Sequence, residues 1–108
     1  MEPISTALFR GEVARRVLVG NEQTGQLTVG LVRFEAGGRN VFHTHTFDQV
    51  LYVTEGEGIV ASEDEEVVVG PGDVVVIPAG QKHWHGATQT NSMAHLAIGT
   101  PGETSIAE

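Results

Sequence analysis

The chain has 108 residues, no cysteine and a formal net charge of −8, from fourteen acidic and six basic side chains. Its length suits one domain, and the lack of cysteine excludes disulfides, zinc–thiolate clusters and iron–sulfur sites. The acidic balance argues against nucleic acid as a partner, because phosphates require a basic surface. No apolar stretch approaches the roughly 20 residues of a membrane helix, so we expect a soluble, cytoplasmic protein that does not associate with membranes.

Short runs of aliphatic and β-branched residues follow one another along the chain, with glycine, proline and acidic residues between them. At the start, only residues 4–12 could hold a helical turn, and Gly11 weakens that prediction. The predicted strands then cover residues 16–19, 27–34, 50–54, 58–61, 67–69, 74–77 and 94–98. Strands this short and this closely spaced are typical of an antiparallel sandwich or barrel.

Two polar segments lie outside these strands. The acidic run 63–66 is predicted to be the solvated tip of a hairpin. The tail 100–108 is predicted to be frayed. We therefore expect a single domain over residues 1–108, with N-terminal strands at about 4–35, a core at about 33–98 and a polar tail at 100–108.

Four of the five histidines form two pairs, His43 with His45 and His83 with His85, whose members are two residues apart. Side chains alternate between the faces of a strand, so both imidazoles of a pair can point into one interior. Gln49 follows the first pair and His95 follows the second. Imidazole is the commonest protein ligand for first-row divalent metals, and the pattern therefore predicts a metal site.

The histidines belong to two spaced motifs. The first runs Gly37-x5-His43-x-His45-x3-Gln49-x6-Gly56, and the second runs Gly72-x5-Pro78-x-Gly80-x2-His83. In this order, with residues 57–71 between them, they resemble the paired signature of the cupin superfamily. The resemblance implies an all-β fold, the double-stranded β-helix or jelly-roll antiparallel barrel, with one metal at the mouth of the barrel.

Segments 43–49, 82–86 and 93–98 resemble a cupin subgroup, the manganese-containing bacterial cupins that act as hydroxynitrile lyases. In that subgroup a glutamine takes the place of the usual first-motif glutamate, as Gln49 does here, and histidines correspond to His85 and His95. The chain departs from the superfamily pattern at Ala87, where asparagine is usual, and from the subgroup at Thr46, where proline is usual.

The resemblance implies a divalent metal held by four neutral ligands, His43, His45, Gln49 and His83. Manganese is expected first, with iron, nickel or zinc as alternatives. Gln49 could instead make only a structural hydrogen bond. As a ligand, an amide in place of a carboxylate would keep the full +2 charge on the site, which strengthens a Lewis acid and disfavours oxidation. Such a centre favours polarisation of a bound oxygen over oxygen activation.

His85 and His95 are the candidate catalytic residues, because imidazoles near a metal can transfer protons near neutral pH. Either could instead be structural. We expect a metal-dependent enzyme acting on a small-molecule substrate, a lyase of the hydroxynitrile type. Two alternatives stay open: a cupin dioxygenase acting on an enol or diketone-type substrate, and a non-catalytic protein that binds a metal or small ligand.

Trp84 lies between the inward-pointing His83 and His85, so strand alternation predicts that it faces away from the interior. An exposed indole is uncommon on a monomer surface. We therefore expect Trp84 to face solvent or a partner subunit, and the protein to form a homodimer.

Overall fold

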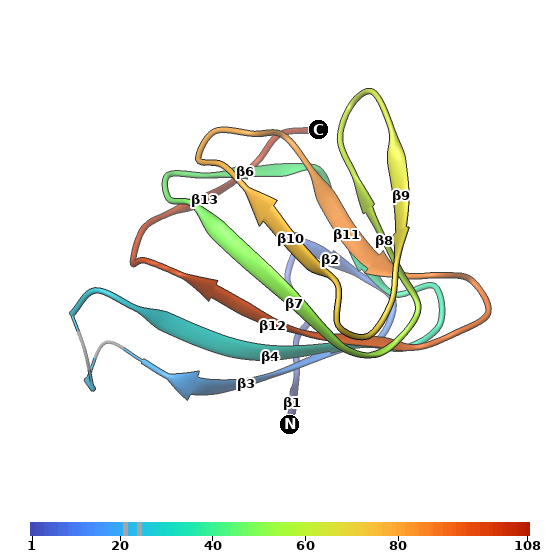
Figure 1. The fold of residues 1–108 in the computed structure, drawn as a ribbon, viewed down its shortest axis with the longest axis horizontal. Helices are drawn as coiled ribbons and strands as arrows, with labels where there is room; N and C mark the ends of the chain where they lie inside the picture. Colours follow the sequence, from blue (N-terminus) through green and yellow to red (C-terminus); the bar gives the residue numbers. More distant parts are fainter. Residues whose placement is uncertain (21, 24) are drawn as a thin grey trace.

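The computed structural model describes residues 1–20, 22–23 and 25–108. Its strands in chain order (Figure 1) are β1 (Glu2–Pro3), β2 (Phe9–Arg10), β3 (Val13–Val19), β4 (Thr28–Phe34), β5 (Arg39–Asn40), β6 (His43–His45), β7 (Gln49–Gly56), β8 (Gly58–Ala61), β9 (Glu66–Val69), β10 (Val74–Ile77), β11 (Trp84–Ala87), β12 (Met93–Gly99) and β13 (Thr104–Ile106). These residues include no helix, and so none that could cross a membrane. The helical turn predicted in 4–12 is wrong: a tight turn, in which Phe9 N–H donates to the Thr6 carbonyl, leads directly into β2.

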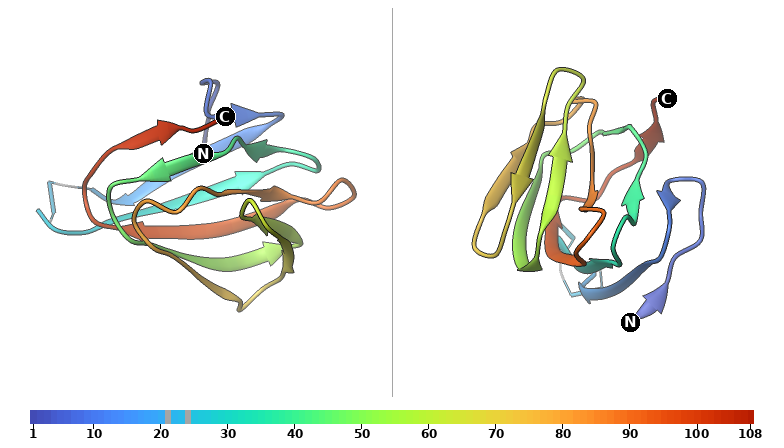
Figure 2. Two further views of the ribbon diagram at one scale, coloured as in Figure 1. Left: turned by 90° about the horizontal axis from the view of Figure 1, so that it is seen from above. Right: turned by 90° about the vertical axis from the view of Figure 1, so that its right-hand side faces the viewer.

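Two antiparallel sheets enclose a common interior (Figure 2). The six-stranded sheet has the order β1-β3-β4-β12-β7-β10, and the five-stranded sheet has the order β2-β5-β11-β8-β9. Neighbours such as β4 and β12 are far apart in sequence, so the chain crosses repeatedly between the sheets. The predicted all-β antiparallel jelly roll is confirmed, and each predicted strand corresponds to an observed one.

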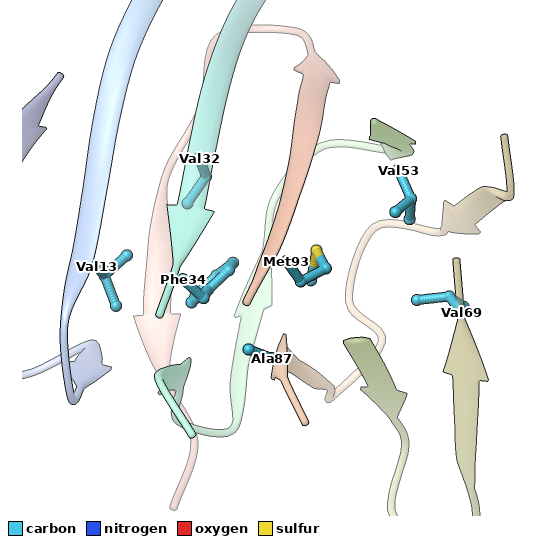
Figure 3. Close-up of a cluster of buried hydrophobic side chains, with 7 residues drawn as sticks. All are labelled: Val13, Val32, Phe34, Val53, Val69, Ala87 and Met93. Atoms are coloured by element: carbon cyan, nitrogen blue, oxygen red, sulfur yellow. The ribbon is translucent and has the colours of Figure 1, made fainter. Parts of the chain in front are cut away.

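Apolar side chains fill one end of this interior. Phe34 at the end of β4 pairs with Met93 at the start of β12, and both are fully buried. Burying each large apolar side chain stabilises the fold by roughly 1.5–3 kcal/mol. The opposite ends of β12 and β7, where Gly99 pairs with Gln49, lie at the other end of the interior. The cluster (Figure 3) comprises Val13, Val32, Phe34, Val53, Val69, Ala87 and Met93.

The turn from β7 to β8 requires a glycine. Gly56 has a φ of 79°, a left-handed conformation that residues with a side chain rarely adopt. A Cβ at this position would also overlap the Ser92 carbonyl. The last glycine of the first motif therefore has a structural role, holding β7 and β12 together at the core end of the interior.

The polar tail is ordered, contrary to the prediction. Residues Thr104–Ile106 form β13, which pairs antiparallel with β6 in a separate two-stranded sheet. Flanking bonds continue the pairing, with Ala107 N–H donating to the Phe42 carbonyl at 2.9 Å. The prediction was wrong because polar composition does not reveal a long-range strand partner for the tail backbone. Residues 63–65 of the acidic run lie at the exposed tip between β8 and β9, as predicted, and Glu66 begins β9.

Trp84 is only 7% exposed, so its predicted outward exposure is wrong. The Arg39 guanidinium, from the neighbouring strand β5, lies 3.8 Å from the indole ring centroid. This cation–π contact covers the ring within a single chain. The side chain that motivated a homodimer is therefore not free to form one, and the homodimer stays a prediction.

Candidate metal centre

Three histidines converge at the end of the interior opposite the apolar core. His43, His45 and His83 each offer a ring nitrogen, and these nitrogens all lie within 4.8 Å of one another. His43 and His45 share a face of β6, as strand alternation predicts. An isolated β-bridge brings in His83: its N–H donates to the His43 carbonyl at 3.1 Å, and His43 N–H donates in return at 2.9 Å. All three side chains are buried.

Hydrogen bonds to backbone carbonyls determine the tautomers of two of these rings. His43 Nδ1–H donates to the Val41 carbonyl at 2.6 Å, and His83 Nδ1–H donates to the Gln81 carbonyl at 2.9 Å. A carbonyl only accepts, so Nδ1 carries the proton and Nε2 carries the lone pair. Nε2 of His83 is buried without a hydrogen-bond partner, as is Nε2 of His45. Buried polar atoms are rarely left unpaired, so these lone pairs fit a divalent metal.

Gln49, at the start of β7, lines the same cavity as His43 and His45. Its Oε1 atom is buried without a hydrogen bond of ordinary geometry. The Gln49 side chain nevertheless lies close enough to the His45 ring to raise the pKa of that ring, so it adjoins a candidate ligand. An amide oxygen is a suitable ligand for hard divalent cations. The four predicted ligands thus supply neutral donor atoms from β6, β7 and the segment before β11.

His85 and His95 form a buried pair beside the cluster. The His85 ring centroid lies 5.7 Å from that of His83 and 5.9 Å from that of His43. On its other side, His85 Nδ1 is hydrogen-bonded to His95 Nε2 at 3.1 Å. The structure therefore brings both candidate catalytic histidines to the side of the candidate metal ligands. His85 lies next to the three-histidine cluster, and His95 lies beyond His85.

Asn40 anchors this pair, and sequence analysis did not identify it. Its Oδ1 accepts the backbone N–H of His85 at 2.8 Å, which places Nδ2 toward the His85 ring, 3.2 Å from Nε2. Both ring nitrogens of His85 therefore have protein partners, whereas Nδ1 of His95 is buried without a side-chain partner, and a hydrogen bond with the Leu96 backbone raises the pKa of the His95 ring. Asn40 occupies one of the unspecified positions between the first glycine and the first histidine of the first motif. Its role depends on the pairing of β5 with β11, which gives no local signal in the sequence.

A cavity of about 500 Å³ lies over these groups. Its volume is within the range of small-molecule sites. Its polar lining includes His43, His45, Gln49, His85 and His95, and its apolar lining includes Leu8, Phe9, Val19, Val32, Phe47 and Ala97. The arrangement can therefore hold a small, partly apolar molecule against both the three-histidine cluster and the buried histidine pair.

All five histidines favour the uncharged form in the folded, metal-free protein. Burial lowers the pKa of His43, His45 and His95 to about 4. Burial also lowers the pKa of His83, and it lowers the pKa of His85 well below its usual value, with a further contribution from His95. At neutral pH these rings are uncharged, which is the form that ligates a metal.

We expect the metal-free protein to lose stability as the pH falls below about 6.5. An unfolded histidine binds a proton near that pH, whereas the folded rings resist protonation down to about 4. The unfolded state therefore binds more protons in this window, and each such histidine lowers the free energy of unfolding by up to about 1.4 kcal/mol per pH unit. Thermal melting of chelator-treated protein between pH 7.5 and 5.5, above the range where carboxylates titrate, measures the effect. An unchanged midpoint over this interval would contradict it.

Comparison with known proteins gives a consistent family assignment. The cupin domain family profile matches residues 30–99. The structure of a cupin-like protein from Thermotoga maritima superposes with a TM-score of 0.92 and 33% sequence identity, over 97% of this chain and 83% of that one. The matched region contains all the candidate ligands and both candidate catalytic histidines.

Two kinds of enzyme occur among the curated relatives. An (R)-mandelonitrile lyase from Granulicella tundricola is 50% identical over 68 residues, which are 62% of this chain and 52% of the relative. An acireductone dioxygenase from Leptospira biflexa is 32% identical over 84 residues, which are 74% of this chain and 45% of the relative. The chain thus spans about half the length of these curated relatives.

Proposed function

This chain belongs to the cupin domain family, and on that premise we propose that it is a metal-dependent lyase that cleaves small cyanohydrins of the mandelonitrile kind. The observation that carries the proposal is the set of buried, unpartnered and uncharged donor atoms beside the cavity. Nε2 of His45, Nε2 of His83 and Oε1 of Gln49 make no hydrogen bond of ordinary geometry within the protein. The similarity to a mandelonitrile lyase supports the choice of substrate class.

The metal would be held by His43, His45, Gln49 and His83, with manganese as the first expectation. A bound divalent ion supplies Lewis-acid chemistry, which lowers the pKa of a hydroxyl group placed beside it. The four side chains contribute no negative charge that would offset this effect. Gln49 also cannot take up a proton, so proton transfer falls to another residue.

His95 is the residue that we assign to proton transfer. Both ring nitrogens of His85 are occupied, by Asn40 and by His95, whereas Nδ1 of His95 has no side-chain partner. In the cleavage direction, the proton of the cyanohydrin hydroxyl passes to the uncharged His85–His95 pair. The bond between the hydroxyl-bearing carbon and the nitrile carbon then breaks, and its electron pair leaves with cyanide. His95 returns the proton to cyanide, so one cyanohydrin gives one carbonyl compound and one hydrogen cyanide, without an oxidant.

The remaining residues position the substrate and the catalytic pair. Phe34 lies beneath both imidazoles, with ring centroids 5.9 Å from His85 and 5.7 Å from His95. Val32 and Phe47 give the cavity an apolar wall, which can receive the carbon substituent of a cyanohydrin and exclude water. His85 and Asn40 hold His95 in place through the hydrogen-bond chain.

A dioxygenase acting on an enol or diketone-type substrate is the second candidate. The acireductone dioxygenase relatives support it, because the same three histidines could serve an oxygen-dependent reaction. The neutral Gln49 argues against it, since no anionic ligand would stabilise an oxidised metal. A non-catalytic metal-binding protein is a weaker alternative, because binding alone does not require a buried His85–His95 pair.

Substituting Gln49→Glu distinguishes the two enzymatic candidates. We expect the wild type to release cyanide from mandelonitrile and to consume no oxygen with enediol or diketone substrates. Gln49→Glu should bind metal at least as tightly, because an anion replaces a dipole, but should release cyanide about tenfold more slowly, a change of about 1.4 kcal/mol in the barrier. An oxygen electrode measures oxygen uptake on the same preparations.

Gln49→Met, which keeps the size of the side chain but removes the amide, is the matched control and should weaken metal binding. Rapid oxygen uptake by the wild type, without cyanide release, would support the dioxygenase instead. If neither Gln49→Glu nor Gln49→Met alters metal affinity, Gln49 is not a ligand.

A further inference from the structure

We infer that Thr104, in the C-terminal strand β13, is a positioning residue of the metal centre, whose hydroxyl holds the His45 ring with Nε2 facing the metal. His45 Nδ1 lies 2.8 Å from Thr104 Oγ1. The inference rests on the proposed metal centre and assigns a role in it to a residue 59 positions away from His45.

His45 bonds to this distant partner, whereas its local acceptor is engaged in backbone pairing. His43 and His83 each donate Nδ1–H to the backbone carbonyl two residues earlier in the chain. For His45 the equivalent acceptor is the His43 carbonyl, which accepts the backbone N–H of His83 at 3.1 Å. The Thr104 hydroxyl takes over the role that a backbone carbonyl has for the other two rings.

The strand that carries Thr104 is attached directly to the ligand-bearing strand. In the described part of the chain, β13 pairs with β6 alone, and Thr104 lies opposite His45 in the register. At the end of the pairing, Thr46 N–H donates to the Glu103 carbonyl at 3.0 Å, and Glu103 N–H donates to Thr46 Oγ1 at 2.9 Å. These bonds fix the register of β13 against β6, and with it the position of the Thr104 hydroxyl relative to the His45 ring.

The loop before β13 holds the other side of the same ring. Phe47 stacks on His45 with a centroid separation of 4.7 Å and an interplanar angle of 28°. A Cβ on Gly102 would lie 2.6 Å from Phe47 Cδ1, and one on Gly99 would lie 3.0 Å from Phe47 Cδ2. Both glycines therefore allow the loop to pack closely on Phe47. His45 is held between the Phe47 ring and the Thr104 hydroxyl, and segment 99–104 arranges both contacts.

Loss of the Thr104 hydroxyl should weaken metal binding more than folding. Without the hydroxyl, the His45 Nδ1–H could bond only to mobile water, because Thr104 is exposed, and the ring would be free to turn or to move its proton to Nε2. Either change removes the Nε2 lone pair from the site. Partners that orient metal-binding histidines typically contribute about 10–100-fold to metal affinity.

The test compares Thr104→Val, which has the same shape without a hydroxyl, with Thr104→Ser, which restores the hydroxyl. Ser105→Ala is the matched control, because Ser105 neighbours Thr104 on β13 but pairs with Thr44. Dissociation constants for Mn²⁺ and Zn²⁺ are measured by competition with a chelator, and melting temperatures are measured on the metal-free proteins. We expect Thr104→Val to bind each ion about 10–100-fold more weakly. Thr104→Ser and Ser105→Ala should stay close to the wild type, and the metal-free melting temperatures of Thr104→Val and Ser105→Ala should be similar.

Wild-type affinity in Thr104→Val would overturn the inference while leaving the metal centre intact. Equal weakening in Thr104→Val and Ser105→Ala would also overturn it, because the cause would then be detachment of the strand. A second measurement does not require a variant: nitrogen NMR of the Zn²⁺-loaded wild type should show the His45 proton on Nδ1, and a proton on Nε2 would contradict the inference. A wild type that binds neither ion would instead contradict the proposed metal centre, and this inference with it.

Discussion

Replacing His43 by alanine should abolish retention of the metal. His43 lies at the centre of the cluster, with its ring centroid 4.8 Å from that of His45 and 4.2 Å from that of His83. Its removal would leave two imidazoles and a weakly donating amide, too few strong ligands for a borderline divalent ion. The wild type should contain about one transition metal ion per chain, with ligand nitrogens about 2.0–2.3 Å from an ion that is somewhat larger than zinc. Elemental analysis of untagged, dialysed protein measures the difference.

His83→Ala should have the same effect, since His83 completes the cluster through its bridge to His43. His95→Asn is the matched control: it removes a buried imidazole outside the cluster and should keep the metal. Melting curves with and without chelator give a second readout, because a ligand that binds only the folded state stabilises it. Chelator should lower the melting temperature of the wild type and leave that of His43→Ala unchanged. A full complement of metal in His43→Ala would refute the assignment of the ligands.

Replacing His95 by alanine should reduce cyanohydrin cleavage by about 10²–10⁴-fold, the usual contribution of a positioned acid or base. Metal content should not change, because His95 contacts the cluster only through His85. The loss should be in kcat, since both proton transfers belong to the chemical steps that follow substrate binding. Cyanide release, metal content and melting temperature should be measured on the same preparations.

His85→Ala tests whether His85 transfers a proton or only positions His95. It should keep the metal and lower activity less than His95→Ala if His85 only positions His95 through their 3.1 Å hydrogen bond. A purely structural role for either histidine predicts a lower melting temperature with unchanged activity per folded molecule. A double variant that is folded, metal-loaded and fully active would remove both residues from the mechanism. If the wild type cleaves none of a panel of aromatic and aliphatic cyanohydrins, the lyase proposal itself is wrong.

Local pattern was sufficient for the fold and for much of the site. Runs such as 74–77 form strands because β-branched side chains favour extended backbone, and glycines such as Gly56 mark turns because only they tolerate its left-handed φ. The alternation of side chains along β6 placed His43 and His45 on one face. Motif spacing indicated that His83 would join them, and the cluster shows that it does.

The tertiary structure alone decided what surrounds these ligands. Asn40 reaches His85 across 45 positions, and Thr104 reaches His45 across 59. Both contacts depend on which strand lies beside which and in what register, and neither leaves a trace in local composition. For the same reason the polar tail became β13 instead of fraying, and Trp84 was covered by Arg39 from a neighbouring strand. Sequence determined the chemical groups of the site, whereas long-range strand pairing determined how those groups are held, because a hydrogen-bond partner far along the chain is specified only once the sheets have formed.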